Sequence, residues 1–195
     1  MGASLRVLGV AALMAIASCA ALPSGTAAAP LANLESFGGT PNGALGGQLS
    51  NSRGVASNQS GDGAPAGSVY VAEGNSNHRI SQFTADGDFV RAWGWDVVSS
   101  GPGNDVTGTP NEFEICVAAD GDVCKAGVSG TAAGQFNNPQ GIAVDQTNGF
   151  LYVTSSTNRR VDVFSGSGQF AGAFGWDVDP AGAVALEFCT AVTTC

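Results

Sequence analysis

An all-β fold built from repeated antiparallel sheets is predicted by three features of the sequence. The segment from Gly134 to Val178 repeats an earlier segment that ends at Val97, and duplicated units of this length are typical of repeat architectures. The matching positions are glycines, turn formers and apolar strand residues, which favour short strands joined by tight turns. One constant interval separates the members of four residue pairs: Arg79 and Arg160, Phe83 and Phe164, Phe89 and Phe170, and Trp95 and Trp176.

Each repeat is predicted to form one sheet. In the second copy, four short apolar runs suit strands, and polar turn formers separate them. The predicted strands are 141–144, 150–153, 160–164 and 170–174. Connections this short are expected in an antiparallel meander, so the sequence predicts a four-stranded sheet in each unit.

Sheets of this kind have apolar residues on both faces, so neighbouring sheets must cover them. Repetition of sheets around a ring is the usual solution, and the sequence therefore predicts a β-propeller of four-stranded antiparallel blades. The predicted organisation is a signal peptide (1–29) and a partial propeller (30–195), which divides into a ring-closing strand (30–39), a first blade (47–97), a Gly-rich disulfide loop (98–133), a second blade (134–178) and the start of a second disulfide loop (179–195).

The repeat resembles the NHL family. In the second copy the resemblance is carried by Gly134-Gln135-Phe136, Pro139-x-Gly141-Ile142-Ala143-Val144-Asp145, Leu151-Tyr152-Val153 and Asn158-x-Arg160-Val161-x-Val163-Phe164. With its insertions that follow a GWDV sequence, the chain looks like a secreted bacterial subgroup. The resemblance implies about six blades in the intact protein, so we expect this chain to be a fragment of a longer protein. The alternative is a short chain that assembles into a ring.

Two polar positions recur in both copies of the repeat. Asn77 and Arg79 in the first copy correspond to Asn158 and Arg160 in the second. The NHL resemblance implies that the arginines are structural. We expect them to join strands or blades through hydrogen bonds.

The amino-terminal segment predicts export. Met1 to Arg6 carries one positive charge, and the apolar run Val7–Ile16 is followed by Ala27-Ala28-Ala29, a small-residue cleavage pattern. The apolar run falls short of the roughly 20 residues of a membrane-spanning helix. A second processing site competes, because the sequence before Cys19 resembles a bacterial lipobox. We therefore expect a secreted protein, or a cell-surface protein with a lipid anchor on Cys19.

The charge balance excludes one class of partner. The chain has 7 basic and 16 acidic residues and a formal net charge of −9. Nucleic-acid binding needs clustered Lys and Arg, whereas the densest basic stretch here is the pair Arg159-Arg160. Nucleic acid is therefore not an expected partner.

Four cysteines beyond the signal peptide form two local pairs, each in an insertion after a repeat. The pairs are Cys116 with Cys124 and Cys189 with Cys195. In an exported chain this spacing predicts disulfides. Zinc is the competing interpretation, but the only histidine, His78, is distant in sequence.

In a propeller, the loops between the second and third strands and the loops between blades share one face. Loops held by a rigid scaffold are suited to recognition, so this face is the predicted binding surface. The residues expected there are Asn75, His78, Trp95, Arg159 and Trp176. We expect His78 to occupy an exposed turn. For the tryptophans, we expect packing beneath the loops; the alternative is that they anchor a partner.

The function predicted from these features is that of a non-catalytic scaffold for a protein, peptide or glycan. No catalytic residue, metal site or cofactor is predicted. The first alternative is an extracellular propeller enzyme, because some NHL-like propellers are metal-dependent lyases and other six-bladed propellers are hydrolases. Such an enzyme would carry its site in blades outside this sequence. The second alternative is a sensor or adhesion domain of a longer protein.

Overall fold

The computed structural model describes residues 42–104, 111–182 and 184–190. Within them the chain is almost entirely strand and turn, which confirms the all-β prediction. No helix in these ranges has the length and apolar character needed to cross a membrane. The predicted signal peptide, the ring-closing strand at 30–39, Cys19 and Cys195 lie outside the described residues.

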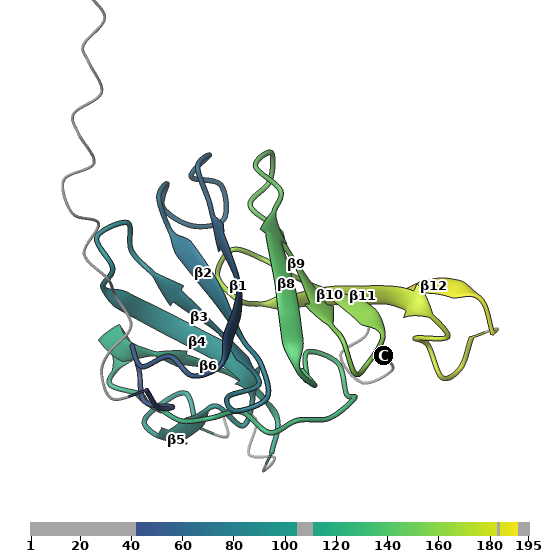
Figure 1. Ribbon diagram of the computed structural model, residues 1–195, viewed down its shortest axis with the longest axis horizontal. Helices are drawn as coiled ribbons and strands as arrows, with labels where there is room; N and C mark the ends of the chain where they lie inside the picture. Colours follow the sequence, from purple (N-terminus) through teal and green to yellow (C-terminus); the bar gives the residue numbers. More distant parts are fainter. Residues whose placement is uncertain (1–41, 105–110, 183, 191–195) are drawn as a thin grey trace, which may run out of the picture. The chain divides into compact units, whose positions relative to one another are not determined.

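Two antiparallel five-stranded sheets form the body of the structure (Figure 1). The first sheet has the order β1-β2-β3-β4-β6, and the second has the order β8-β9-β10-β11-β12. The strands of the first sheet are β1 (Ser52–Ser57), β2 (Val69–Glu73), β3 (Arg79–Phe83), β4 (Phe89–Trp95) and β6 (Phe113–Val117). Those of the second are β8 (Pro139–Val144), β9 (Leu151–Ser155), β10 (Arg160–Phe164), β11 (Phe170–Trp176) and β12 (Leu186–Cys189).

The four repeat strands lie where the sequence predicts them, but the prediction of four strands per sheet is one strand short. Each insertion supplies a fifth strand, β6 or β12, which pairs with the preceding fourth strand. The first insertion also forms a small two-stranded antiparallel sheet, because β5 (Val98–Ser100), which precedes β6, pairs with β7 (Val123–Cys124), which follows it. The short 3-10 helix η1 (Ala118–Asp120) lies between β6 and β7.

A predicted disulfide joins this small sheet to the first sheet. Cys116 of β6 is bonded to Cys124 of β7, which confirms the first cysteine pair and excludes zinc at these two sulfurs. Cys189 is also disulfide-bonded. Disulfides are typical of proteins outside the cytoplasm.

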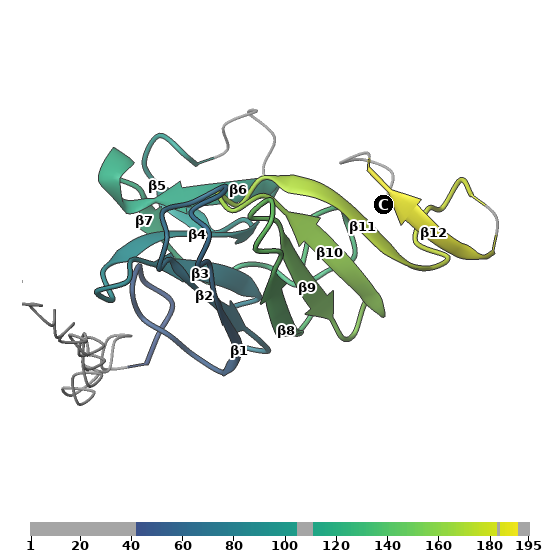
Figure 2. The ribbon, with the colours of Figure 1, turned by 90° about the horizontal axis from the view of Figure 1, so that it is seen from above.

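The main core lies between the two sheets, which meet along β1 and β8 (Figures 1 and 2). Residues from both sheets form one cluster: Tyr70, Ala72, Ile80 and Trp93 from the first sheet, and Phe136, Leu151, Val153 and Phe164 from the second sheet and the segment before it. Trp93 is fully buried, and its ring lies 6.2 Å from the ring of Phe164. Apolar burial of this kind stabilises the pairing of the sheets.

Candidate binding surfaces

The two turns that the sequence places on one face both contact the end of the first insertion and the segment after it, at one end of the two sheets. We call this the loop end and define it by the turns 74–78 and 156–159 and the segment 125–138. Three hydrogen bonds join the first turn and the fourth strand to this segment: Gly127 N to the Asn77 carbonyl at 2.8 Å, Val128 N to the Trp95 carbonyl at 2.8 Å, and Asn138 N to His78 Nδ1 at 3.2 Å.

His78 differs from its expected position in an exposed turn. Its side chain is half-buried, and Nδ1 accepts the hydrogen bond from Asn138 N. Burial lowers the pKa of the imidazole, because a cation is less stable away from water. A neutral ring with an acceptor at Nδ1 fits this role, so His78 connects the first sheet to the segment that leads into β8.

Arg79 is fully buried and donates hydrogen bonds to the segment before the first sheet and to Lys125, which follows β7. Its Nε donates to Glu73 Oε1 at 2.9 Å, and its other nitrogens donate to backbone carbonyls. These acceptors are the carbonyl oxygens of Ala44, Leu45, Gln48 and Lys125. Asn77 assists from the same turn by donating to the Gly43 carbonyl at 2.8 Å.

Arg160 repeats the arrangement in the second sheet. Its nitrogens donate to the carbonyl oxygens of Thr131, Ala132 and Gln135, which correspond to Ala44, Leu45 and Gln48 in the repeat. Asn158 donates to the Gly130 carbonyl at 2.8 Å, as Asn77 does to Gly43. Both Asn-x-Arg pairs therefore hold the loop that enters their own sheet.

The carboxylate beside each arginine comes from a different position. In the first sheet it is Glu73 at the end of β2, whereas in the second it is Asp162 on β10, whose Oδ1 accepts from Arg160 Nε at 2.8 Å. Asp162 is fully buried, and its Oδ2 has no hydrogen-bond partner among the described residues. Burial raises the pKa of Asp162 to about 7, although Arg160 acts in the opposite direction.

This shift predicts a pH effect. Because the folded state favours the protonated carboxyl, the unfolded chain binds fewer protons between pH 4 and 7. The contribution of Asp162 to stability is therefore complete below its unfolded pKa of about 4 and is lost as pH rises through about 7. Relative to Asp162→Asn, the wild-type free energy of unfolding should fall from about pH 5 to about pH 8. Urea denaturation of both proteins at each pH tests this, and parallel pH profiles would contradict it.

The remaining predicted surface residues have different environments. Asn75 and Arg159 are exposed on the two turns, and Trp95 is half-buried. Trp176 is 67% exposed at the end of β11. The expectation that it packs beneath a loop is therefore wrong. Of the three tryptophans, it is Trp93 that is buried between the sheets.

Within residues 42–104, 111–182 and 184–190, no three His, Cys, Asp or Glu side chains are grouped closely enough to hold a metal ion. The exposed polar side chains of the loop end include the amide of Asn75 and the guanidinium of Arg159.

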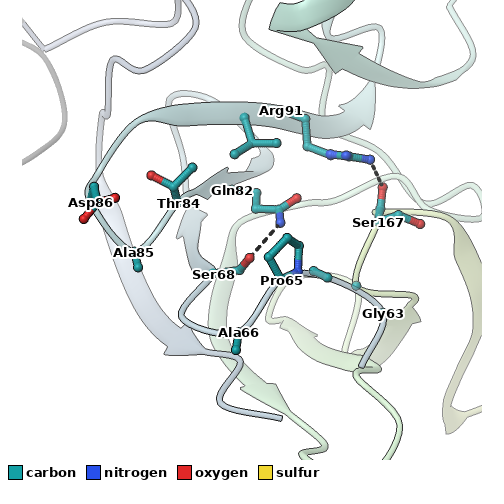
Figure 3. A pocket seen from close by; sticks show the side chains of 13 residues that line it. Gly63, Pro65, Ala66, Ser68, Gln82, Thr84, Ala85, Asp86, Arg91 and Ser167 are labelled. Atoms are coloured by element: carbon teal, nitrogen blue, oxygen red, sulfur yellow. Dashed lines mark hydrogen bonds between the residues drawn. The ribbon is translucent and has the colours of Figure 1, made fainter. Parts of the chain in front are cut away.

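A pocket that the sequence analysis did not single out lies at the opposite end of the sheets (Figure 3). Its volume is about 370 Å³, near the lower limit of small-molecule sites, roughly 300 Å³. Three turns surround it: the turn before β2, the turn between β3 and β4, and the turn between β10 and β11. One signal in the sequence is the long Gly-rich turn of the first copy, because the second copy has only a short turn at that place.

Comparison with known proteins leaves the family open. No family model matches the sequence, and no curated protein matches it. The resemblance to NHL repeats therefore stays a prediction that rests on the sequence motifs.

Proposed function

We propose that this chain is part of an exported, non-catalytic NHL propeller whose loop end binds a protein, peptide or glycan. The observation that carries the proposal is the hydrogen-bonded junction of Asn77, Trp95 and His78 with the segment 125–138. This junction is held further by Arg79 and by the disulfide of Cys116. Loops ordered before binding lose less entropy when a ligand arrives, so such a platform favours recognition.

The uncovered face of the second sheet supports the propeller. In the first sheet, Tyr70, Ile80 and Trp93 are buried against the second sheet. Their three counterparts in the second sheet, Tyr152, Val161 and Phe174, are only half-buried. Beside them on the same sheet, Phe188 and Leu186 of β12 are 56% and 74% exposed. We infer that a further sheet of the same repeat covers this apolar face.

The binding proposal is tested with the intact, oxidised chain against a glycan array and a phage-displayed peptide library. We expect a selective ligand whose affinity falls at least tenfold, about 1.4 kcal/mol, in Asn75→Ala or Arg159→Ala. Thr147→Ala is the matched control, because Thr147 is exposed on a turn at the opposite end. The absence of any selective ligand, or loss of binding in the control alone, would overturn the proposal.

A further inference from the structure

We propose that the pocket in Figure 3 binds a small hydroxylated monocarboxylate, such as a hydroxy acid or a hexuronic acid. The pocket lies between the two sheets, at the end opposite the loop end. The proposal therefore stands whether or not the loop end binds a ligand.

The strongest support comes from the differences between the two copies of the repeat. Gln82 of β3 pairs with Arg91 of β4, and both side chains line the pocket. At the equivalent register of the second sheet, Val163 of β10 pairs with Gly172 of β11. The fold is thus built with an apolar residue and a glycine at these two positions, and it does not require a buried amide and a guanidinium.

A third position shows the same replacement. Ser68, directly before β2, accepts a hydrogen bond from Gln82 Nε2 at 3.3 Å. The residue directly before β9 is Phe150. Three polar residues of the first copy, each replacing a nonpolar one, therefore meet around a single cavity.

Two polar atoms at this site lack partners. Gln82 is 2% exposed, and its Oε1 accepts no hydrogen bond from any described residue. Arg91 donates from Nη1 to the Ser167 carbonyl at 3.1 Å, but its Nε is buried without an acceptor in the described structure. Leaving such groups unpaired costs about 1–3 kcal/mol each, which a ligand that pairs with them would offset.

The charge of Arg91 indicates what kind of ligand fits. None of the ion pairs among the described residues includes Arg91, so its half-buried guanidinium is available to an anion. A guanidinium matches the planar geometry of a carboxylate. Gln82 Oε1 needs a donor, which a hydroxyl group next to the carboxylate supplies.

The rest of the pocket limits the ligand further. Pro65, Ala66 and Val90 form apolar walls that suit a short carbon skeleton. Asp86 lies at the edge of the pocket (Figure 3), where its negative charge opposes a second anionic group on the ligand. These walls and charges favour one carboxylate on a small hydroxylated body.

One wall of the pocket is formed by the Gly-rich turn of the first copy. Gly63 of this turn has a φ of 72°, a left-handed conformation that glycine adopts without steric cost. A side-chain carbon on Gly149 would approach the Asp62 carbonyl oxygen to 1.9 Å, so glycine there lets the turn pack directly on the second sheet. The turn thereby brings Pro65 opposite Gln82.

The test uses the intact chain and three probes, D-glucuronate, D-lactate and the neutral D-glucose, in ligand-observed NMR titrations. We expect glucuronate or lactate to bind at least tenfold more tightly than glucose. Arg91→Gln should remove this preference, whereas Arg53→Gln, at an exposed arginine outside the pocket, should keep it.

Gln82→Val keeps the experiment decisive if Arg91→Gln fails to fold, because the second sheet has valine at this position. This variant should unfold at an equal or higher urea concentration than the wild type and should bind the carboxylate at least tenfold more weakly. Failure of both carboxylates to bind, equal binding of glucose, or unchanged binding in Gln82→Val would overturn the proposal.

Discussion

Replacing Arg79 with methionine is expected to lower the free energy of unfolding by about 3–5 kcal/mol. Arg79 is fully buried and pairs with Glu73 at 2.9 Å, and Glu73 is itself fully buried. Methionine has a similar length but donates no hydrogen bond. The substitution therefore leaves a carboxylate buried without its cation, and it removes the donors to four backbone carbonyls.

The partners of Glu73 moderate this effect without cancelling it. Its carboxylate also accepts hydrogen bonds from Ser50 N, Asn77 Nδ2 and Ser81 Oγ. Because Arg79 and Glu73 contact each other, the loss of free energy of unfolding in the double variant Arg79→Met, Glu73→Gln should be smaller than the sum of the losses in the two single variants. Urea denaturation of the oxidised chain provides all four free energies of unfolding.

Arg159→Met is the matched control, since Arg159 is exposed and directly precedes the buried Arg160. We expect a change below about 0.5 kcal/mol for this variant. A comparable loss in Arg159→Met and Arg79→Met, or additive effects in the double-mutant cycle, would show that the buried guanidinium is not the source of the stability.

The repeat allowed much of this fold to be predicted, because each strand signal occurs twice. The second copy places its strands within two residues of the observed β8 to β11, and the recurrence of Asn-x-Arg indicates a structural role that the paired hydrogen bonds of Arg79 and Arg160 explain. The fifth strand was missed although Phe113-Glu-Ile-Cys and Leu186-Glu-Phe-Cys correspond. Each is a short run inside an insertion, where pairing with the fourth strand supplies stability. In the first insertion the Cys116–Cys124 disulfide adds to it.

The position of the pocket could not be predicted from the sequence, because the packing of the two sheets forms it. Its walls come from turns that are distant in the sequence, around Pro65, Asp86 and Ser167. Only the packing of two sheets brings them together. Gln82 and Arg91 differ from their repeat counterparts in sequence, but a polar residue in a strand is usually exposed to solvent, and only the structure shows that Gln82 is buried.

The second large effect is expected for Trp93→Ala, which should reduce the free energy of unfolding by about 3–5 kcal/mol. The Trp93 ring is fully buried between the sheets and contacts Tyr70 and Phe164, with ring centroids 6.0 Å and 6.2 Å apart. Its indole nitrogen has no acceptor within the described residues, so the ring stabilises the fold by apolar burial. Removing it leaves a cavity at the contact between the two sheets.

Two further variants separate burial from residue type. Trp93→Phe introduces the residue type that the second copy has at the equivalent position, Phe174. Because an aromatic ring again fills most of the space, this variant should lose less than half as much free energy of unfolding as Trp93→Ala. Trp176→Ala, at a ring that is 67% exposed, should change the free energy of unfolding by less than about 0.5 kcal/mol. Thermal and urea denaturation of the three variants provide the comparison. If Trp176→Ala destabilised the chain as much as Trp93→Ala, the core between the sheets would not be the main source of its stability.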